Sequence, residues 1–230
     1  MLQSKVNFFV SLFMLLFFYT HAQSHKEKGF FIDVNVNATH RIEGEQTASQ
    51  FQRKITQTVT NGIQYGITGY YQTPFLKNTS LGLKYLLNKN HGEENTSLYI
   101  IDGQLEEGNL QNSSQLHYIG ASAMSSFLFG DDKNEAFFEP SVGYFYYHQE
   151  IEIDTKQTLK GGNIGFSATF GYLRHIGSNF CIGLNLGYLN ANLETYKLKN
   201  NNGERKIEAS RNAALVLGSF HGGFLMRYKI

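Results

Sequence analysis

The sequence predicts an all-β protein: an eight-stranded antiparallel transmembrane β-barrel with an up-and-down meander topology, preceded by a signal peptide. Three observations lead to this prediction. Eight segments alternate between large apolar and small or polar residues, the connections between them alternate between short and long, and the last segment keeps its alternation to the final residue. A strand that ends at the chain terminus needs a partner on each side, and closure of the sheet supplies both.

The composition suits a barrel better than a nucleic-acid-binding protein. Lys and Arg number 20 against 19 Asp and Glu, so no strong positive field favours nucleic acid. The chain is rich in aromatic residues and glycine, with 19 Phe, 14 Tyr and 23 Gly, yet its mean hydropathy is modest. Lipid-facing and lumen-facing residues average out along each strand of a membrane barrel, which explains this combination. A secreted soluble sandwich is the competing class.

Residues 1–22 are predicted to be a cleaved signal peptide, and residues 23–230 the barrel domain. Lys5 supplies the positive region, VNFFVSLFMLLFFYT the apolar region, and Thr20-His21-Ala22 an A-x-A-like cleavage site. A transmembrane anchor is the alternative, but the apolar run is shorter than the roughly 20 residues that a spanning helix needs.

Alternation assigns one face of each segment to lipid and the other to the lumen. The segments are FFIDVNVNA (30–38), GIQYGITGYY (62–71), SLGLKYLL (80–87), LHYIGASAMSSFLF (116–129), EAFFEPSVGYFYY (135–147), NIGFSATFGYL (163–173), FCIGLNLGYL (180–189) and a last one from about 213 to 230. The faces opposite the large residues carry mainly Gly, Ser, Thr and Asn, which fit a narrow lumen, whereas a water-facing surface usually carries Lys and Glu.

Two of these segments need comment. The fourth has small or apolar residues on both faces, and we expect Ile119, Ala121, Ala123, Phe127 and Phe129 to point outward. The fifth contains a proline at position 140, which removes a hydrogen-bond donor from the ladder, so we expect a β-bulge there.

The connections predict the topology. Those after the second, fourth and sixth segments are short (QTPFLKNT, GDDKN and RHIGSN), whereas the others are long and polar (41–60, 88–115, 148–162 and 191–212). Outer-membrane barrels have short periplasmic turns and long extracellular loops. We therefore expect both termini in the periplasm, because an even number of strands starts and ends on the same side.

The C-terminal stretch GGFLMRYKI resembles the assembly signal of outer-membrane barrels, in which alternating hydrophobic residues lead to a terminal aromatic residue. It departs from that signal by ending in Ile230 and by having Leu225 where the signal has glycine. From signal peptide to last strand, the chain resembles the small eight-stranded outer-membrane β-barrel (porin-like) protein family of Gram-negative bacteria. The resemblance implies outer-membrane lipid and the barrel assembly machinery as partners. It carries no catalytic motif and no cofactor.

Four charged residues fall on the lumen side of their segments: Asp33, Lys84, Glu139 and Arg227. All four lie toward the periplasmic ends of their strands, and an eight-stranded barrel has an interior just wide enough for side chains. Because unpaired charges there are costly to desolvate, we expect a hydrogen-bonded polar plug and no stable open channel. Asp33 and Arg227 are the expected direct pair, since closure makes their strands neighbours.

The long loops are the candidate binding surface. Loop 88–115 carries one lysine against five acids, a net charge of −4, and it contains an apolar run at 98–101 that could extend the barrel as a hairpin above the membrane. The candidate binding residues in it are Tyr99, Ile101, Glu106 and Glu107. Simple solvation of charged loops is the alternative.

Other reactive residues lead to weaker hypotheses. Ser219 and His221 share a face, as in some lipid A deacylases, but their order is reversed, no acidic partner is evident, and they face the lumen. The histidines lack metal-ligand spacing. The only cysteine, Cys181, is expected to pack inside the barrel. The predicted function is thus a structural or surface-binding role, with a narrow ion channel as the alternative and a lipid-modifying enzyme as the third possibility.

Overall fold

The computed structural model describes residues 29–42, 59–72, 78–101, 104–130, 133–152, 156–201, 203–208 and 214–230, without the side chains of residues 94–101 and 104–108. The predicted signal peptide lies outside the described residues. The strands are β1 (Phe30–Arg41), β2 (Asn61–Gln72), β3 (Thr79–Ile101), β4 (Gln104–Phe129), β5 (Asn134–Glu152), β6 (Lys156–His175), β7 (Phe180–Leu193), β8 (Thr195–Asn200), β9 (Gly203–Glu208), β10 (Leu215–Val216) and β11 (Ser219–Lys229).

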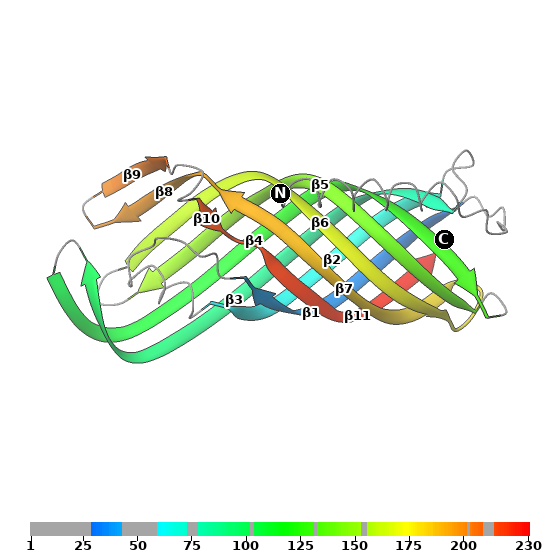
Figure 1. Cartoon of the computed structure of the whole chain (residues 1–230), viewed down its shortest axis with the longest axis horizontal. Coiled ribbons are helices and arrows are strands. Elements are labelled where there is room, and N and C mark those ends of the chain that lie inside the picture. The colour runs from blue at the N-terminus through cyan, green and yellow to red at the C-terminus, as the bar shows by residue number, and fades with distance from the viewer. Residues whose placement is uncertain are drawn as a thin grey trace, which may run out of the picture.

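Eight of these strands close into an antiparallel barrel, as predicted. Each strand from β1 to β7 pairs with the next, and β11 closes the barrel by pairing with β7 on one side and β1 on the other (Figure 1). Ile230 continues the contact, because its backbone N–H donates to the carbonyl oxygen of Phe30. The alternation that runs to the end of the chain therefore belongs to a strand that is paired on both edges.

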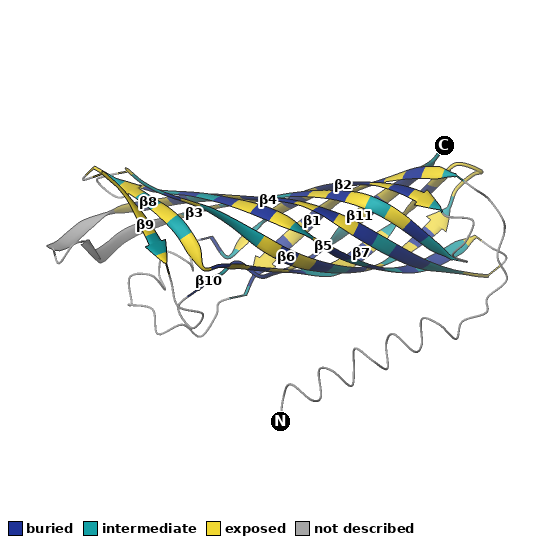
Figure 2. Ribbon diagram, turned by 90° about the horizontal axis from the view of Figure 1, so that it is seen from above, coloured by how far each residue is buried: buried dark blue, intermediate teal, exposed yellow. Residues whose placement is uncertain are grey.

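The predicted outward and inward faces are confirmed along the barrel strands. Exposed and buried residues alternate along β1, β2, β6, β7 and β11, which gives the chequered pattern of Figure 2. The exposed set is strongly apolar and includes Leu186 (70% exposed) and Phe224 (74% exposed), whereas Asp33 and Arg227 are only 3% and 2% exposed. A closed barrel with apolar residues outside and polar residues inside is suited to a lipid surround.

Loops 88–115 and 148–162 are mostly paired strand rather than long connections, and in the first of them this agrees with the hairpin extension suggested by the apolar run at 98–101. Strands β3 and β4 stay paired from Thr79 opposite Ser125 to Ile101 opposite Gln104, with a register shift between Glu94 and Ser97. Strands β5 and β6 stay paired to Glu152 opposite Lys156. The loss of apolar alternation marked where the strands leave the apolar belt, whereas the backbone ladder continues because its hydrogen bonds do not depend on side-chain polarity.

The region 191–212 also contains more structure than a loop. Strands β8 and β9 form a hairpin, and β8 pairs with β6 beyond the point where β7 leaves it. The closing strand starts later than predicted, at Ser219, and the short strand β10 precedes it on the edge of β7. At the end of the barrel opposite the C-terminus, the β8–β9 hairpin thus takes the place of β7 as the neighbour of β6 (Figure 1).

Two finer predictions had different outcomes. In β4, Ile119, Ala121 and Phe129 are exposed as expected, but alternation breaks where Met124 and Ser125 are both buried.

The β-bulge expected at Pro140 is not found: the β4–β5 pairing skips this residue and resumes at Ser125 opposite Phe138 in the same register. Loss of one donor interrupts the ladder locally, while the unbroken β5–β6 pairing holds the strand in place.

None of the described residues forms a helix that is long and apolar enough to cross a membrane.

Candidate functional site

The lumen near the short turns is occupied by a charged network centred on Arg227. Asp33 on β1 and Arg227 on β11 are directly opposite each other in the ladder. The guanidinium binds the carboxylate with two parallel hydrogen bonds, Nε to Oδ1 at 2.7 Å and Nη2 to Oδ2 at 2.8 Å. This bidentate geometry is the strong form of an arginine–carboxylate pair, so the two strands that close the barrel are also joined across their side chains.

A third acid, which the sequence analysis missed, completes the environment of Arg227. Glu135 at the start of β5 accepts a hydrogen bond from Nη1 of Arg227, and its other oxygen lies 3.3 Å from Nε2 of His175. The sequence contains a signal for it, because Glu135 has the same strand parity as the predicted Glu139. The expected balance of two acids and two bases is therefore corrected to three acids and two bases, with His175 beside the additional acid.

The second ion pair joins β3 to β5. Lys84 donates from Nζ to Oε2 of Glu139 at 2.7 Å and to Oγ1 of Thr169 on β6 at 3.1 Å. Lys84 and Glu139 are 2% and 3% exposed. The structure thus joins the four predicted lumen residues as two ion pairs, and Asp33 with Arg227 is the direct pair that was expected.

Aromatic side chains fill the space around the network. Arg227 lies over the ring of Phe31 at 4.5 Å and over that of Phe137 at 5.4 Å, distances typical of cation–π contacts. Phe137 lies against the wall at Gly171, where any Cβ would overlap its ring. Cys181 packs here, as expected, in a buried cluster with Phe31, Tyr70, Met124, Phe137, Leu173 and Leu225. Charged pairs and rings together block this end of the lumen.

The middle of the lumen is lined by uncharged polar residues. Asn37 donates from its side-chain amide to Asn35 at 3.2 Å and to Gln64 at 2.8 Å. Asn88 donates to the hydroxyl oxygen of Ser219 at 3.5 Å, and this serine is not bonded to His221. Both Ser219 and His221 are buried in the lumen, as expected. Their arrangement does not form the serine–histidine pair that nucleophilic catalysis requires.

The end of the lumen nearest the long strands holds a second buried cluster. It comprises Leu86, Leu116, Tyr118, Phe145, Tyr147, Leu159, Leu189, Ala191, Leu193 and Leu217. Tyr118 shares a hydrogen bond with Ser141 at 3.0 Å, and Tyr147 donates to Gln149 at 3.0 Å. Different kinds of side chain therefore fill the two ends of the lumen. Ion pairs occupy the short-turn end, and packed aromatic and aliphatic side chains occupy the other.

The four predicted binding residues lie on the extended hairpin of β3 and β4. The backbone pairing places Tyr99 opposite Glu106, Leu98 opposite Glu107 and Ile101 opposite Gln104. Their side chains lie outside the described part of the structure. The hairpin extends beyond the other barrel strands, so these positions are at the far tip of the protein (Figure 1).

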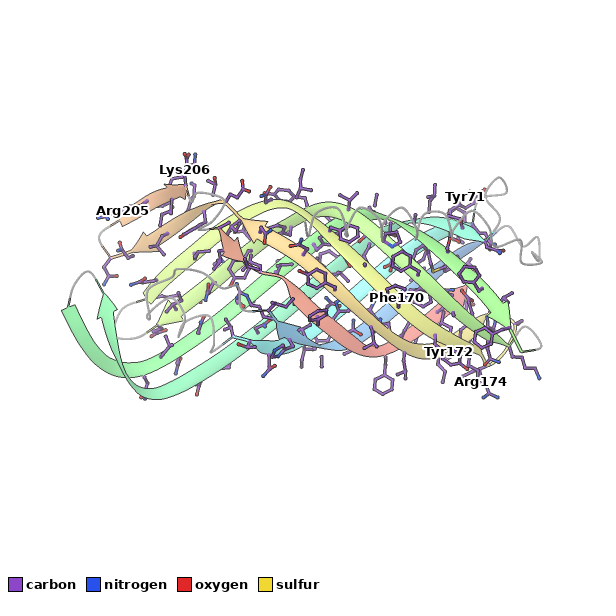
Figure 3. All side chains as sticks on the ribbon, viewed as in Figure 1. Tyr71, Phe170, Tyr172, Arg174, Arg205 and Lys206 are labelled. Carbon is purple, nitrogen blue, oxygen red and sulfur yellow. The ribbon has the colours of Figure 1, made fainter. Side chains whose placement is uncertain are left out.

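A second outer surface combines lysines from three strands. Lys160 on β6 is opposite Lys197 on β8, which is opposite Lys206 on β9, and all three side chains are exposed. Figure 3 shows Arg205 and Lys206 at this end of the molecule, and Tyr71, Tyr172 and Arg174 at the other. Lys197 and Lys206 form ion pairs with Glu204 and Glu208. Like charges directly opposite each other destabilise a sheet, so this lysine row needs those acids.

A further ion-pair group lies where the β5–β6 pairing ends, with Lys156 exposed and Glu150 and His148 half-buried. Glu150 lies 2.9 Å from Nζ of Lys156 and 3.3 Å from Nε2 of His148. Hydrogen bonds from Lys156 and then from His148 hold the pKa of Glu150 below its usual range. No group of three or more His, Cys, Asp or Glu side chains in the described ranges is placed to hold a metal ion.

The Lys84–Glu139 pair yields a stability prediction. Glu139→Ala leaves the buried ammonium of Lys84 without its carboxylate, and breaking such a pair typically costs about 3–5 kcal/mol. We expect the urea midpoint of refolded protein in lipid vesicles to fall sharply. The control is Glu204→Ala, which breaks an exposed pair on the β8–β9 hairpin and should leave the midpoint almost unchanged. Equal midpoints for Glu139→Ala and the wild type would contradict the plug as a stabilising element.

Comparison with known proteins identifies the fold but no sequence relatives. No protein-family description matches the sequence, and no curated protein matches it. Neisserial surface protein A superposes with a TM-score of 0.54 at 13% identity, covering 88% of this chain and 97% of that one. The outer membrane protein OprG from Pseudomonas aeruginosa superposes with a TM-score of 0.53 at 12% identity, covering 90% and 98%.

A third solved structure, a major outer membrane protein from Thermus thermophilus, has a TM-score of 0.53 at 10% identity and covers 86% of this chain and 99% of its own. At these identities the likeness concerns the fold alone. The closed ladder, the apolar outer face and these superpositions agree: the chain has the fold of the small eight-stranded outer-membrane β-barrel proteins.

Proposed function

We propose that the protein is an integral outer-membrane barrel that does not conduct solutes and acts through the surface it presents outside the bilayer, as a structural or binding protein. The charged network around Arg227 is the observation that carries the proposal. Arg227 on β11 binds Asp33 on the neighbouring strand β1, and its bond to Glu135 on β5 crosses the lumen. A solute would have to break these buried pairs to pass.

The proposed outer surface has two parts with opposite charge. The tip of the β3–β4 hairpin carries the acids Glu106 and Glu107 beside Tyr99 and Ile101 in the ladder. The other part is the lysine row formed by Lys160 on β6 and by Lys197 and Lys206 on the β8–β9 hairpin. Ordered strands hold both parts away from the apolar belt, which supports a surface-binding role better than a role confined to the membrane.

The proposed topology places the short turns and both termini in the periplasm and the long strands outside the cell. Support comes from the extension of β3, β4, β5 and β6 and from the β8–β9 hairpin, all at the end of the barrel opposite the C-terminus, because outer-membrane barrels project farther on the extracellular side. Catalysis is not part of the proposal, because Ser219 and His221 lack the geometry of a nucleophile and its base. A narrow channel is the second candidate, favoured by the uncharged polar lining around Asn37 and Gln64.

Planar-bilayer recording separates the plugged barrel from the channel. We expect no steady conductance steps from the refolded wild-type protein, because the Arg227 pairs fill the lumen. The double variant Asp33→Ser/Arg227→Ser removes the central pair and should produce brief openings. A general porin in the same bilayers serves as the positive control. Large steady steps from the wild type would overturn the plug and favour the channel.

The topology is testable with single cysteines, since the native Cys181 is buried. Asn201→Cys lies between β8 and β9, and Lys133→Cys lies in the short connection before β5. We expect a membrane-impermeant maleimide added to intact cells to label the first variant and to label the second only after lysis. Labelling of Lys133→Cys in intact cells, with Asn201→Cys protected, would invert the topology.

Binding through the outer surface is testable by capture. Intact cells displaying the wild-type protein should retain envelope proteins or surface polysaccharide that cells with a hairpin-tip variant lose. The tip variant is Tyr99→Ala/Ile101→Ala/Glu106→Gln/Glu107→Gln, and the matched variant is Lys160→Gln/Lys197→Gln/Lys206→Gln. Loss in one variant alone identifies the binding part. Identical retention by the wild type, by both variants and by cells without the protein would exclude the surface-binding role.

A further inference from the structure

The lumen contains a second buried arginine whose environment differs from that of Arg227. Arg41, the last residue of β1, is 5% exposed and lies at the end of the barrel opposite the charged network. Its guanidinium donates to the hydroxyl oxygen of Tyr147 at 3.2 Å and to the backbone carbonyl of Val216 at 3.3 Å. Both acceptors are neutral, and no carboxylate pairs with this arginine in the part of the chain that the structure describes.

The hydrogen bonds of Arg41 are also long and incomplete. Its two bonds exceed the usual 2.9–3.0 Å for N–H to O, whereas Arg227 binds its carboxylate at 2.7 and 2.8 Å. The Nε of Arg41 has no hydrogen-bond partner among the described residues. The ring of Tyr147, 5.5 Å from the guanidinium carbon, gives a cation–π contact, which offsets only part of the cost of burying the charge.

Arg41 lies at a recess that contains other polar atoms without partners. The recess has a volume of about 20 Å³ and is lined by residues of β1, β3, β4, β5 and β11, with Leu217 before β11. Thr39 and Asn88 line it with Arg41; within the described ranges Oγ1 of Thr39, which can donate, lacks a partner, and so does Oδ1 of Asn88, which can only accept. A buried cation with free hydrogen-bonding capacity thus faces a space that admits roughly one small polar group.

We propose that this recess binds the anionic group of a soluble ligand: a phosphate, a sulfate or a carboxylate. An oxyanion that accepts hydrogen bonds from Nε and Nη2 of Arg41 would have the same bidentate geometry as the carboxylate of Asp33 on Arg227. It would replace the long hydrogen bond from Nη2 to the carbonyl oxygen of Val216. The hydroxyl of Thr39 can donate to the same anion. Val216 belongs to the two-residue strand β10, so little structure opposes this exchange.

The position of the recess determines where the ligand comes from. Arg41 faces the lumen, whereas lipid contacts the other face of β1, so a lipid headgroup does not reach it. The Arg227 network blocks the lumen on the far side, so the anion enters and leaves from the end with the long strands. The recess is a dead end, and its volume accommodates only the acidic end of a larger ligand. This inference does not depend on what the two outer hairpins bind.

The test is calorimetric titration of the refolded full-length protein in neutral detergent, at low chloride, with inorganic phosphate, sulfate, acetate and glucose 6-phosphate as probes. We expect saturable binding of at least one anion. Arg41→Gln should bind it about tenfold or more weakly, because a charge-assisted bidentate contact is lost. Arg174→Gln, which removes an exposed arginine at the opposite end of the barrel, should bind it as the wild type does.

The controls separate binding from folding. Heat-dependent gel mobility reports whether each variant is a folded barrel, and Arg41→Lys retains the charge while removing the planar fork. If Arg41→Gln does not fold, Thr39→Val takes its place and should weaken binding by about threefold or more, the lower range for one hydrogen bond. Tighter binding of glucose 6-phosphate than of phosphate would indicate a larger natural ligand, and the reverse a free ion. Absence of saturable binding in the wild type, or equal binding by wild type and Arg41→Gln, would overturn the proposal.

Discussion

The structure depends on one constraint: every backbone group of a strand in the apolar belt must find its partner in a neighbouring strand. Hydrocarbon offers no alternative donor or acceptor, so an open edge would leave a row of unpaired groups. Strand β11 removes the last edge by lying between β7 and β1. Barrel closure therefore requires that the C-terminal strand stay regular to its end, which accounts for a feature that is unusual for a chain terminus.

Closure with eight strands also determines the chemistry of the interior. The lumen is too narrow for bulk water around charged side chains, so each charge placed there needs a partner. The short-turn end meets this requirement with carboxylates: Asp33 and Glu135 for Arg227, and Glu139 for Lys84. Space for the aromatic rings around these groups comes from glycines, and Gly171, the ladder partner of Phe137 on the neighbouring strand, is the clearest case.

The opposite end follows a different rule because water is available outside the apolar belt. There the strands no longer need apolar outer faces, and β3, β4, β5 and β6 continue as paired strands beyond the segments of regular apolar alternation. The same end contains Arg41, whose buried charge has only Tyr147 and a backbone carbonyl as partners among the described residues. Among the described residues, Arg227 therefore has carboxylate partners, whereas Arg41 has only neutral ones.

Much of the barrel was predictable from sequence, because alternation is a local property with a period of two residues. Segment 30–38 indicated which side chains face lipid, and the register of the first and last strands followed from closure, which places Asp33 beside Arg227. The parity of Glu135 was equally readable, but its contact with Arg227 was not, since the two residues lie on strands that face each other across the lumen.

Sequence by itself determined the strand faces, the closed topology and the small residues that line the interior, because each follows from the residue pattern along one strand. Only the tertiary structure decided the ends of β3–β6, the β8–β9 hairpin and the recess beside Arg41. Where a strand ends depends on whether its neighbouring strand continues, and the polarity pattern of one segment contains no information about its neighbour. The recess depends on residues of several strands whose side chains converge only after the barrel has closed.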